Sequence, residues 1–352
     1  MKKIVMTGGG TAGHVTPNIA LFPYLKEAGY EIYYIGSYNG IEKGLIEGQG
    51  IAYYGISSGK LRRYFDWKNF SDPFRVLKGY FEAKKLMKKI KPDVVFSKGG
   101  FVSVPVVMAA KKSKVKAIIH ESDMTPGLAN KLAFPSATKV CCNFPETIKY
   151  LPEGKGVLTG SPIRQELFSG SKEKGLDFLG FKNGKPVILV MGGSIGSVFV
   201  NGAVRGTLDT LLESFNIVHL VGKGNIDETL VDRPGYKQFE FISEELADVF
   251  AATDLMISRA GANSICEILA LKIPNVLIPL SKAASRGDQI LNANSFKKQG
   301  FSTVIEEEEL TSELLIESVL DVYARRDEIV KTMESSQLID SNKAILDLIC
   351  NI

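Results

Sequence analysis

The sequence predicts an α/β protein in which two Rossmann-like domains face each other across a cleft. Its 352 residues exceed what one typical core needs, so two domains are expected. Each half of the chain opens with the same pattern, a short apolar strand followed by a glycine-rich loop and a helix. Short apolar runs then alternate with helical patterns in both halves, which is typical of parallel sheets with helical crossovers.

Composition places the chain among ordinary globular proteins, with 45% apolar residues, 23% charged residues and a net charge of +4. The four cysteines form no CxxC pair and are expected to be free thiols in a reducing compartment. Met1-Lys2-Lys3 leads directly into a strand, and no apolar run has membrane-spanning length. We therefore expect a cytoplasmic protein that is able to contact a membrane surface.

The first unit of the chain is a strand at Lys3–Thr7, a glycine loop at 8–13 and a helix at Pro17–Ala28. Its glycines satisfy G-x-G-x-x-G, but the next strand, Glu31–Gly36, is not followed by the acidic residue that holds a ribose of NAD, so we do not expect NAD. The loop brings backbone N–H groups close to a ligand. It also places His14 at the mouth of the cleft, where a helix N-terminus lowers the pKa of a histidine and keeps it neutral. His14 is therefore a candidate proton acceptor, and a capping or packing role is the alternative.

Residues 60–91 are strongly basic, with eleven basic and three acidic side chains, a local net charge of +8, and interleaved aromatic residues. Asp72-Pro73 is typical of a helix start, and an apolar face follows it. Basic charge beside aromatic residues suits an anionic bilayer surface better than single-stranded nucleic acid. The alternative is that the apolar face belongs to the core and the lysines to a solvated face. The residues expected to contact the membrane are Phe74, Arg75, Leu77, Lys78 and Phe81.

Two further strands of the first half end in polar residues. Asp93–Ser97 is followed by Lys98-Gly99-Gly100-Phe101, and Ala117–Ile119 is followed by His120-Glu121-Ser122-Asp123. Because the carboxyl ends of parallel strands meet at one edge, these groups are expected in the same cleft as the loop histidine, with Asn130 on the next helix. Such a cluster suggests acid–base or sugar-hydroxyl chemistry, and a structural ion pair is the alternative.

The boundary between the halves is predicted from turn residues. Val140–Cys142 and Gly156–Thr159 are expected to be the last strands of the first half, Thr159–Arg164 a hinge, and Lys172–Lys185 an exposed linker. The second half is expected to contain strands at Pro186–Met191, Asn216–Val221 and Gln238–Phe241, a glycine loop at 192–197 and a helix at Val198–Leu212.

Residues Leu255–Pro279 have the pattern of a βαβ unit, with a glycine turn between the first strand and the helix. The loop and first helical turn, Ala262–Glu267, are therefore expected to meet a nucleotide, with backbone N–H groups for a phosphate. The carboxylate of Glu267 can accept two hydrogen bonds from a ribose diol. Ser264-x-x-Glu267 also fits a capping box, in which the glutamate only closes the helix end.

The last part of the chain begins with the polar run 281–289, which leads into a helix through Gln299. Asp288 and Gln289 at its start suit sugar hydroxyls, and helix capping by Asp288 is the alternative. Glu306–Glu309 is expected to be a solvated acidic run. The tail from Thr311 is predicted to be helical and to cross back to the first half.

Taken together, these motifs resemble the MurG family of peripheral membrane glycosyltransferases, which add N-acetylglucosamine to lipid I to give lipid II for peptidoglycan. The resemblance covers nearly the whole chain. It rests on Gly9-Gly10-Thr11-Ala12-Gly13-His14, Lys98-Gly99-Gly100-Phe101, His120-Glu121, Gly160-Ser161-Pro162-Ile163-Arg164, Gly192-Gly193-Ser194-Ile195-Gly196, Ser258-Arg259-Ala260-Gly261 with Glu267, and Arg286-Gly287-Asp288-Gln289-Ile290-Leu291-Asn292-Ala293. The chain departs from many relatives at Asp123, where they have Asn, and at Asp288, where they have Gln.

The resemblance implies a glycosyltransferase-B architecture and a role for each domain. Residues 1–161 would bind acceptor and membrane, 162–335 would bind UDP-N-acetylglucosamine, and 336–352 would pack back on the first domain as a helix. His14 and Glu121 are the implied catalytic residues, and Glu121 is the rival base because burial can raise the pKa of a carboxyl group toward neutral pH. The implied acceptor-binding residues are Gly99, Gly100, His120 and Asn130.

The resemblance also implies a set of donor-binding residues. Ile242 would meet the uracil through its backbone, Glu267 the ribose and Gln289 the N-acetylglucosamine. Arg164, Ser194 and the 262–266 loop would take the diphosphate. The full set is Thr11, Ala12, Gly13, Asp123, Arg164, Ser194, Ile242, Ala262, Asn263, Ser264, Ile265, Cys266, Glu267 and Gln289.

The implied reaction moves N-acetylglucosamine from UDP-N-acetylglucosamine to the C4 hydroxyl of N-acetylmuramic acid in lipid I, with inversion, at the cytoplasmic face of the cell membrane. Helix N-termini and Arg164 can stabilise the departing diphosphate, and no Asp-x-Asp lies in a strand-end loop, so we expect no metal or other cofactor. The expected partners are both substrates, an anionic membrane surface and other cell-wall and division proteins, without nucleic acid. A UDP-sugar epimerase on the same scaffold and a non-catalytic nucleotide- or lipid-binding protein are the alternatives. The basic segment argues against the epimerase.

Overall fold

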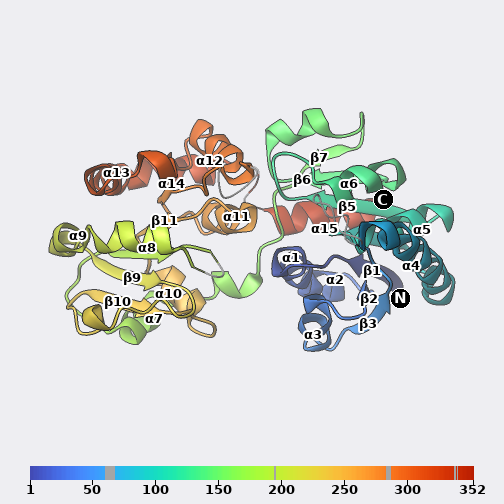
Figure 1. The fold of residues 1–352 in the computed structure, drawn as a ribbon, viewed down its shortest axis with the longest axis horizontal. Helices are drawn as coiled ribbons and strands as arrows, with labels where there is room; N and C mark the ends of the chain where they lie inside the picture. The colour runs from blue at the N-terminus through green and yellow to red at the C-terminus, as the bar shows by residue number, and fades with distance from the viewer. Residues whose placement is uncertain (60–67, 194–195, 283–286, 337, 339) are drawn as a thin grey trace. The chain divides into compact units, whose positions relative to one another are not determined.

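The computed structural model describes residues 1–59, 68–193, 196–282, 287–336, 338 and 340–352. The chain forms two compact units (Figure 1). The first unit contains Met1–Arg164 together with Asp340–Ile352, and the second contains Gln165–Ile339.

The first unit is built on a parallel sheet of seven strands in the order β3-β2-β1-β4-β5-β6-β7. The strands are β1 Lys2–Thr7, β2 Tyr30–Ser37, β3 Ala52–Ile56, β4 Val94–Ser97, β5 Lys116–Glu121, β6 Lys139–Cys142 and β7 Gly156–Leu158. The helices are α1 Thr16–Ala20, α2 Phe22–Glu27, α3 Ile41–Glu47, α4 Lys68–Ile90, α5 Ser103–Lys112, α6 Leu128–Ala133 and α15 Ser341–Asn351. Strands β1, β4 and β5 pair in parallel, so their carboxyl ends lie at the same edge of the sheet.

Two apolar clusters fill the two faces of this sheet. One face carries Val5, Val95 and Ile119 against the buried side of α4 and α5. The other face carries Ile4, Met6 and Phe96, and there the C-terminal helix α15 contributes Ile345 and Ile349 (Figure 1). Tyr30 Oη also donates a hydrogen bond to the Ile349 carbonyl at 3.5 Å. The last helix of the chain is therefore part of the core of the first unit.

The second unit is built on a parallel sheet in the order β10-β9-β8-β11-β12-β13. The strands are β8 Val187–Met191, β9 Asn216–Leu220, β10 Tyr236–Phe239, β11 Leu255–Ser258, β12 Asn275–Leu277 and β13 Thr303–Val304. The helices are α7 Lys172–Leu179, α8 Val198–Arg205, α9 Leu208–Ser214, α10 Leu246–Ala252, α11 Ala262–Ala270, α12 Asp288–Lys298, α13 Ser312–Ala324 and α14 Arg326–Glu334.

The predicted fold class is confirmed, but several elements differ from the prediction. The segment Lys172–Lys185, predicted to be an exposed linker, instead contains helix α7. Ser171 caps this helix by accepting the N–H of Lys174, and Gly175 packs so tightly on α10 that an added Cβ would lie 2.1 Å from the carbonyl oxygen of Asp248. Strands β3 and β13 were not predicted, and the predicted helices at 17–28 and 198–212 are each divided in two.

Candidate active site

Two glycine loops lie in direct backbone contact at the carboxyl edge of the first sheet. A Cβ added to Gly100, which has φ +84°, would lie 2.3 Å from the carbonyl oxygen of Gly9. The buried carboxylate of Glu42 holds the first loop from α3, because it accepts the N–H of Gly10 at 3.2 Å and the N–H of Ser37 at 2.9 Å. Only glycine allows this close approach, so the two loops pack backbone against backbone and hold the neighbouring side chains in place.

His14 is the last residue of a short 3-10 turn, η1 Ala12–His14, that follows the first glycine loop. Its Nδ1 lies 3.2 Å from the Gly9 carbonyl oxygen and 3.1 Å from Thr11 Oγ1. A carbonyl oxygen only accepts hydrogen bonds, so Nδ1 carries the proton and Nε2 presents a lone pair. The ring has the tautomer that a proton acceptor requires.

The pKa of His14 is lowered, first by burial and then by the positive charge of Lys98, while the bond to Gly9 and the charge of Glu42 oppose the shift. The sequence suggested a helix N-terminus as the cause, but the structure assigns the effect to burial and to Lys98. Because the pKa lies below its ordinary value of 6.5, His14 is uncharged at neutral pH.

Asn130 and Gly99 lie directly beside His14. A Cβ added to Gly99 would lie 3.4 Å from Asn130 Oδ1 and 3.6 Å from His14 Cδ2. Asn130 is buried and donates from Nδ2 to the His120 carbonyl and to Glu121 Oε2, at 3.3 and 2.9 Å. Among the residues that the structure describes, none bonds to its Oδ1. An unsatisfied buried acceptor costs about 1–3 kcal/mol, so this oxygen is a natural partner for a ligand hydroxyl.

The carboxylate of Glu121 is occupied by the loop that follows β5. It accepts the N–H of Asp123 at 3.1 Å, the N–H of Gly127 at 3.0 Å and the amide of Asn130 at 2.9 Å. Burial raises the pKa of Glu121, and the bonds from Asn130 and Gly127 oppose the increase. Glu121 therefore holds Asn130 in place.

Most of the donor-side candidates belong to the second unit, where the N-cap of α11 supplies no side-chain hydrogen bond. The N-cap residue is Gly261, and no side chain bonds to the first turn from that position. Ser264 is the third residue of the helix, so the capping-box interpretation of Ser264 and Glu267 is wrong. Glu267 is half-buried on the second turn. The first turn has the character of an anion site at a helix N-terminus.

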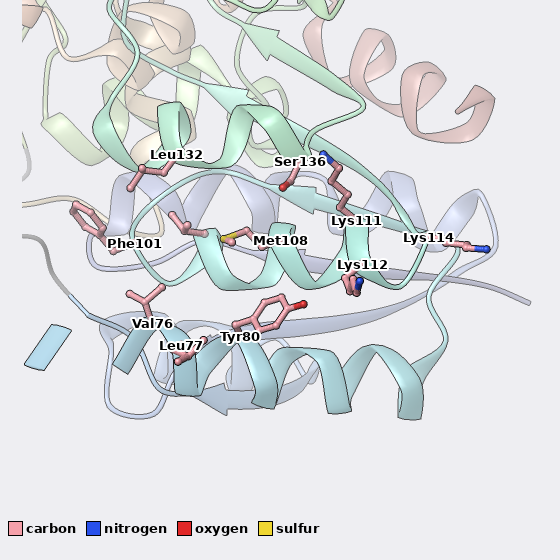
Figure 2. A pocket seen from close by; sticks show the side chains of 11 residues that line it. Val76, Leu77, Tyr80, Phe101, Met108, Lys111, Lys112, Lys114, Leu132 and Ser136 are labelled. Atoms are coloured by element: carbon pink, nitrogen blue, oxygen red, sulfur yellow. The ribbon is translucent and has the colours of Figure 1, made fainter. Parts of the chain in front are cut away.

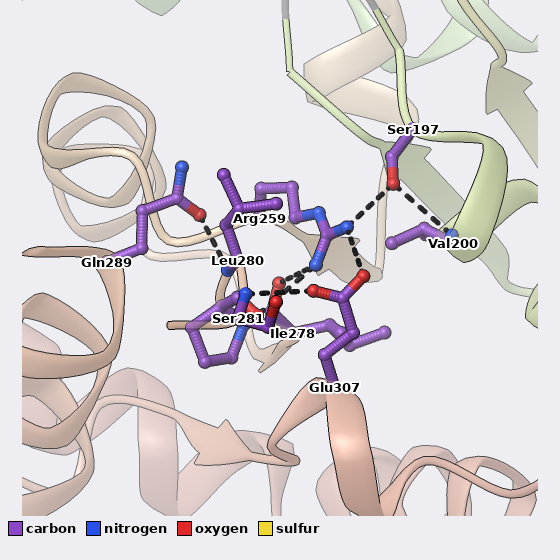
Figure 3. A network of polar contacts seen from close by, with 9 residues as sticks. Ser197, Val200, Arg259, Ile278, Leu280, Ser281, Gln289 and Glu307 are labelled. Carbon is purple, nitrogen blue, oxygen red and sulfur yellow. Dashed lines mark hydrogen bonds and ion pairs between the residues drawn. The ribbon is translucent and has the colours of Figure 1, made fainter. Parts of the chain in front are cut away.

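Arg259 braces the loops around this helix (Figure 3). Its guanidinium donates to the carbonyls of Ile278 and Pro279 at 3.1 and 3.2 Å, and to Ser197 Oγ at 2.8 Å. It also forms an ion pair with Glu307 at 3.0 Å, and the same carboxylate accepts the N–H of Ser281 at 2.9 Å. Although partial burial opposes it, these bonds lower the pKa of Glu307. The expectation that Glu306–Glu309 is only a solvated acidic run is therefore wrong at Glu307.

Gln289 lies on the first turn of α12, next to this brace. Its Oε1 accepts the N–H of Leu280 at 3.0 Å, and its amide nitrogen points away from Leu280 (Figure 3). The N-cap of α12 is Gly287, with φ +81°, so the interpretation of Asp288 as the capping residue is wrong. Asp288 is instead the first residue of the helix.

The remaining candidates are distributed over both units. Ile242 is buried in the segment after β10, next to the exposed Phe241. Arg164 is the last residue of the first unit's main segment. Thr11 and Ala12 are exposed and Gly13 is half-buried, whereas Ala262, Ile265 and Cys266 are buried. Ser194 lies outside the described residues. Within the described ranges, no group of three or more His, Cys, Asp and Glu side chains is placed to hold a metal ion.

The apolar residues singled out on α4 are exposed, so they do not belong to the core. Phe74, Leu77 and Phe81 have exposed fractions of 74%, 53% and 58%. Beside them, an apolar groove of about 750 Å³ runs between α4, α5 and α6, with lysines gathered at one end (Figure 2). It is lined by Val76, Leu77, Tyr80, Phe101, Val104, Met108, Lys111, Lys112, Lys114, Leu132 and Ser136. None of the described helices is both long and apolar enough to span a bilayer.

Comparison with known proteins identifies the fold and the family. Residues 4–142 match the glycosyltransferase family 28 N-terminal domain, and residues 187–349 match the glycosyltransferase family 28 C-terminal domain. The crystal structure of Acinetobacter baumannii MurG superposes with a TM-score of 0.79 at 27% identity and covers 100% of both chains. A glycosyltransferase from Rickettsia africae superposes with a TM-score of 0.68 at 14% identity, with 99% and 97% of the chains covered, which supports the fold alone. The chain is thus a glycosyltransferase of the GT-B fold.

Sequence relatives place it within that class. The chain is 66% identical over 349 residues to the UDP-N-acetylglucosamine–N-acetylmuramyl-(pentapeptide) pyrophosphoryl-undecaprenol N-acetylglucosamine transferase of Lachnospira eligens, covering 99% of both chains. It is 64% identical over 349 residues to the protein of the same name from Lachnoclostridium phytofermentans, covering 99% of this chain and 98% of the relative. The chain belongs to the MurG family of N-acetylglucosaminyltransferases.

Proposed function

We propose that this enzyme transfers N-acetylglucosamine from UDP-N-acetylglucosamine to the C4 hydroxyl of N-acetylmuramic acid in undecaprenyl-pyrophosphoryl-N-acetylmuramoyl-pentapeptide. The product is lipid II. The observation that carries the proposal is His14, an uncharged histidine with the lone pair on Nε2, beside the unsatisfied buried oxygen of Asn130. In a chain of this family, that pair is suited to receive and deprotonate a sugar hydroxyl.

The first unit binds the acceptor and deprotonates its hydroxyl group. Asn130 Oδ1 orients the acceptor sugar through one of its hydroxyl groups, while His14 Nε2 accepts the C4 hydroxyl proton. The C4 oxygen then attacks the anomeric carbon from the face opposite the diphosphate. The bond from that carbon to the diphosphate oxygen breaks, and UDP leaves with the bonding electrons, so the configuration inverts. Gly99, Gly100, His120 and Glu121 shape this half of the site.

Most of the residues proposed to bind the donor belong to the second unit. The first turn of α11 and Arg164 neutralise the leaving diphosphate, as anions are bound at helix N-termini and by arginine. Glu267 accepts the ribose hydroxyls, the Ile242 backbone meets the uracil and Gln289 donates to the N-acetylglucosamine. Thr11, Ala12, Gly13, Asp123, Ser194 and the 262–266 turn complete the proposed donor contacts. These groups supply positive potential without a metal, so chelation by EDTA is expected to leave turnover unchanged.

The acceptor is held at a membrane, and the enzyme reaches it from the cytoplasmic face. Phe74, Leu77 and Phe81 are exposed on one face of α4, next to the groove of Figure 2. Arg75 and Lys78 are exposed on the same helix. Exposed aromatic side chains with neighbouring basic residues favour a surface that carries anionic phospholipid.

A single comparison tests the reaction. The enzyme is incubated with UDP-N-acetylglucosamine, with and without a lipid I analogue, and UDP and sugar products are measured. Release of UDP only in the presence of the acceptor is the expected result. Isomerisation of the sugar without acceptor would instead indicate an epimerase, and binding without turnover would indicate a non-catalytic protein. His14→Ala in parallel separates enzymatic release from background hydrolysis.

A further inference from the structure

Lys98 is one of the most deeply buried side chains of the protein, with 1% of its surface exposed. It follows β4, and its backbone N–H donates to the Thr7 carbonyl at 2.9 Å. Its Nζ lies 2.8 Å from His120 Nδ1, 2.8 Å from Ser122 Oγ and 3.2 Å from Ser161 Oγ. An ammonium group has three N–H donors, so these contacts match its full donor capacity.

The partners of Lys98 come from different parts of the first unit. His120 and Ser122 belong to the end of β5 and the loop after it, whereas Ser161 belongs to the segment after β7. His120 Nε2 lies 2.8 Å from the Gly160 carbonyl oxygen, which only accepts, so Nε2 carries the ring proton. Nδ1 is then the acceptor for the ammonium of Lys98. One buried cation thus fixes the tautomer and orientation of the ring.

His120 in turn supports the acceptor side of the site, because its carbonyl oxygen accepts a hydrogen bond from Asn130 at 3.3 Å. The charge of Lys98 also acts on His14. The charged groups that affect His14 are Lys98, beyond β4, and Glu42, on α3. Their effects are opposite: Lys98 lowers the pKa of His14 and Glu42 raises it. Tyr34, whose hydroxyl donates to the Gly8 carbonyl at 2.8 Å, is a neutral phenol because burial raises its pKa.

We propose that Lys98 is a positioning residue for the acceptor half of the site: its ammonium locks His120 against residues 160–161 and so fixes the carbonyl that holds Asn130 beside His14. A second part follows from the same placement, because Gly99, the next residue in the chain, packs against His14, so the charge of Lys98 acts on that ring. The second part rests on the proposed function, in which His14 is the base. The first part depends only on the contacts of Lys98. Lys98 itself does not touch the reacting atoms.

Nuclear magnetic resonance of the full-length protein labelled with ¹⁵N on histidine tests both parts, because the sequence contains only three histidines. In the unaltered enzyme, His120 is expected as the Nε2–H tautomer from pH 5 to 9. A His120 ring protonated on Nδ1 would overturn the proposal without any variant. In Lys98→Met, which keeps an unbranched side chain of similar length, the pKa of His14 is expected to rise toward 6.5. An unchanged His14 pKa in a folded variant would also overturn it.

Two controls accompany this measurement. Lys26→Met removes the same charge from the exposed surface of α2, where water and salt screen it, so the pKa of His14 should stay where it is. His219 lies in the second unit and should stay uncharged, with the same ring signals, throughout this pH range in every variant. A shift in Lys26→Met equal to that in Lys98→Met would show a general charge effect and overturn the role of Lys98.

The pH dependence of turnover separates this proposal from the proposed function. In Lys98→Met, the acid limb of the kcat profile is expected to move upward by the same amount as the pKa of His14, while the KM for UDP-N-acetylglucosamine stays within about twofold. If the His14 pKa moves and the acid limb does not, His14 is not the base, and the positional role of Lys98 stands alone. If neither moves, the inference about Lys98 fails, and the acceptor-dependent release of UDP still decides the reaction.

Discussion

The two units place a buried cation at the same topological position, but they use it differently. Lys98 follows β4, which pairs with β1, and Arg259 follows β11, which pairs with β8. The backbone N–H of Lys98 donates to the carbonyl of Thr7, the last residue of β1, at 2.9 Å. The backbone N–H of Arg259 likewise donates to the carbonyl of Met191, the last residue of β8, at 3.2 Å. Both cations therefore lie beneath a glycine loop, at the carboxyl edge of a parallel sheet.

The partners of the two cations explain the difference. Arg259 bonds to two carbonyls, a hydroxyl and the carboxylate of Glu307, so its fork braces several loops at once (Figure 3). Lys98 contacts a ring nitrogen and two hydroxyls, and its charge lowers the pKa of both His120 and His14. The duplicated fold thus supports a brace between several loops in one unit and a positive charge that acts on two histidines in the other.

The largest expected effect is the loss of the brace. Arg259→Met leaves the half-buried carboxylate of Glu307 without its guanidinium, and breaking an ion pair costs up to about 3–5 kcal/mol when the pair is fully buried. Chemical denaturation should show this loss in the free energy of unfolding of the second unit. Arg325→Met is the matched control, because its pair with Asp321 is about half exposed on both sides and is worth at most about 1 kcal/mol. Equal losses in the two variants would contradict the brace.

The next effect concerns proton transfer in the first unit. His14→Ala should lower turnover about 100-fold or more, since a general base contributes at least that much, with UDP affinity nearly unchanged. Steady-state kinetics with saturating acceptor measures it. Glu121→Ala should mainly weaken acceptor binding, because Glu121 holds Asn130. If His14→Ala retains near-normal turnover and Glu121→Ala abolishes it, the base is Glu121.

The buried histidine of the second unit predicts a pH effect on stability. His219 is fully buried between Tyr236 and Asn201, and burial followed by the charge of Arg205 lowers its pKa to about 3. The folded state then binds fewer protons than the unfolded state between pH 3 and 6.5, so stability rises with pH in this window and is lost as pH falls. At pH 5 the loss is about 2 kcal/mol.

The stability of the first unit should depend less strongly on pH, because two of its buried groups act in opposite directions. The pKa of His120 is lowered, as that of His219 is, but the pKa of Glu121 is raised by burial, so Glu121 favours the folded state at low pH. Denaturation at pH 7 and pH 5 measures the difference, with His219→Gln as the control that should remove the part of the second unit's pH dependence that His219 contributes. A His219→Gln protein that loses the same stability on acidification would refute the assignment.

A smaller effect is expected for donor recognition. Glu267→Ala should weaken UDP binding about tenfold or more, because a hydrogen bond to a charged group contributes about 1.5–3 kcal/mol. Calorimetric titration with UDP measures it, and Glu317→Ala, an exposed acid on α13, is the control. Thermal stability should change little, since Gly261 and not Ser264 is the N-cap of α11. Unchanged affinity would remove Glu267 from the donor site.

The sequence predicted the parallel sheets and the glycine loops because their signals are local. Apolar runs, turn residues and helix periodicity lie within a few residues of each other, and His14, Glu121 and Asn130 follow them directly. The roles of Lys98, Glu42 and Glu307 depend on partners that are distant in sequence, so no local pattern predicts them. A lysine placed directly after a buried strand and before two glycines was the one available signal for Lys98. Helix α7 was missed because its glycine and lysines resemble a linker, although Gly175 is required for its packing on α10.

The smallest effect on stability, and the sharpest contrast with the buried cations, is expected on the exposed face of α4. Changing Phe74, Leu77 and Phe81 together to Ser removes exposed apolar surface, so the free energy of unfolding should change by no more than about 0.5 kcal/mol per site. Binding to vesicles that contain phosphatidylglycerol should nevertheless be lost in a sedimentation assay, because each aromatic or leucine side chain contributes apolar area to the membrane contact. Turnover of a water-soluble lipid I analogue should be retained.

The matched control changes Ala83, Met87 and Ile90 on the buried face of the same helix to Ser, which should unfold the first unit. If the exposed triple variant unfolds as the buried one does, this face is core and the membrane assignment of α4 is wrong.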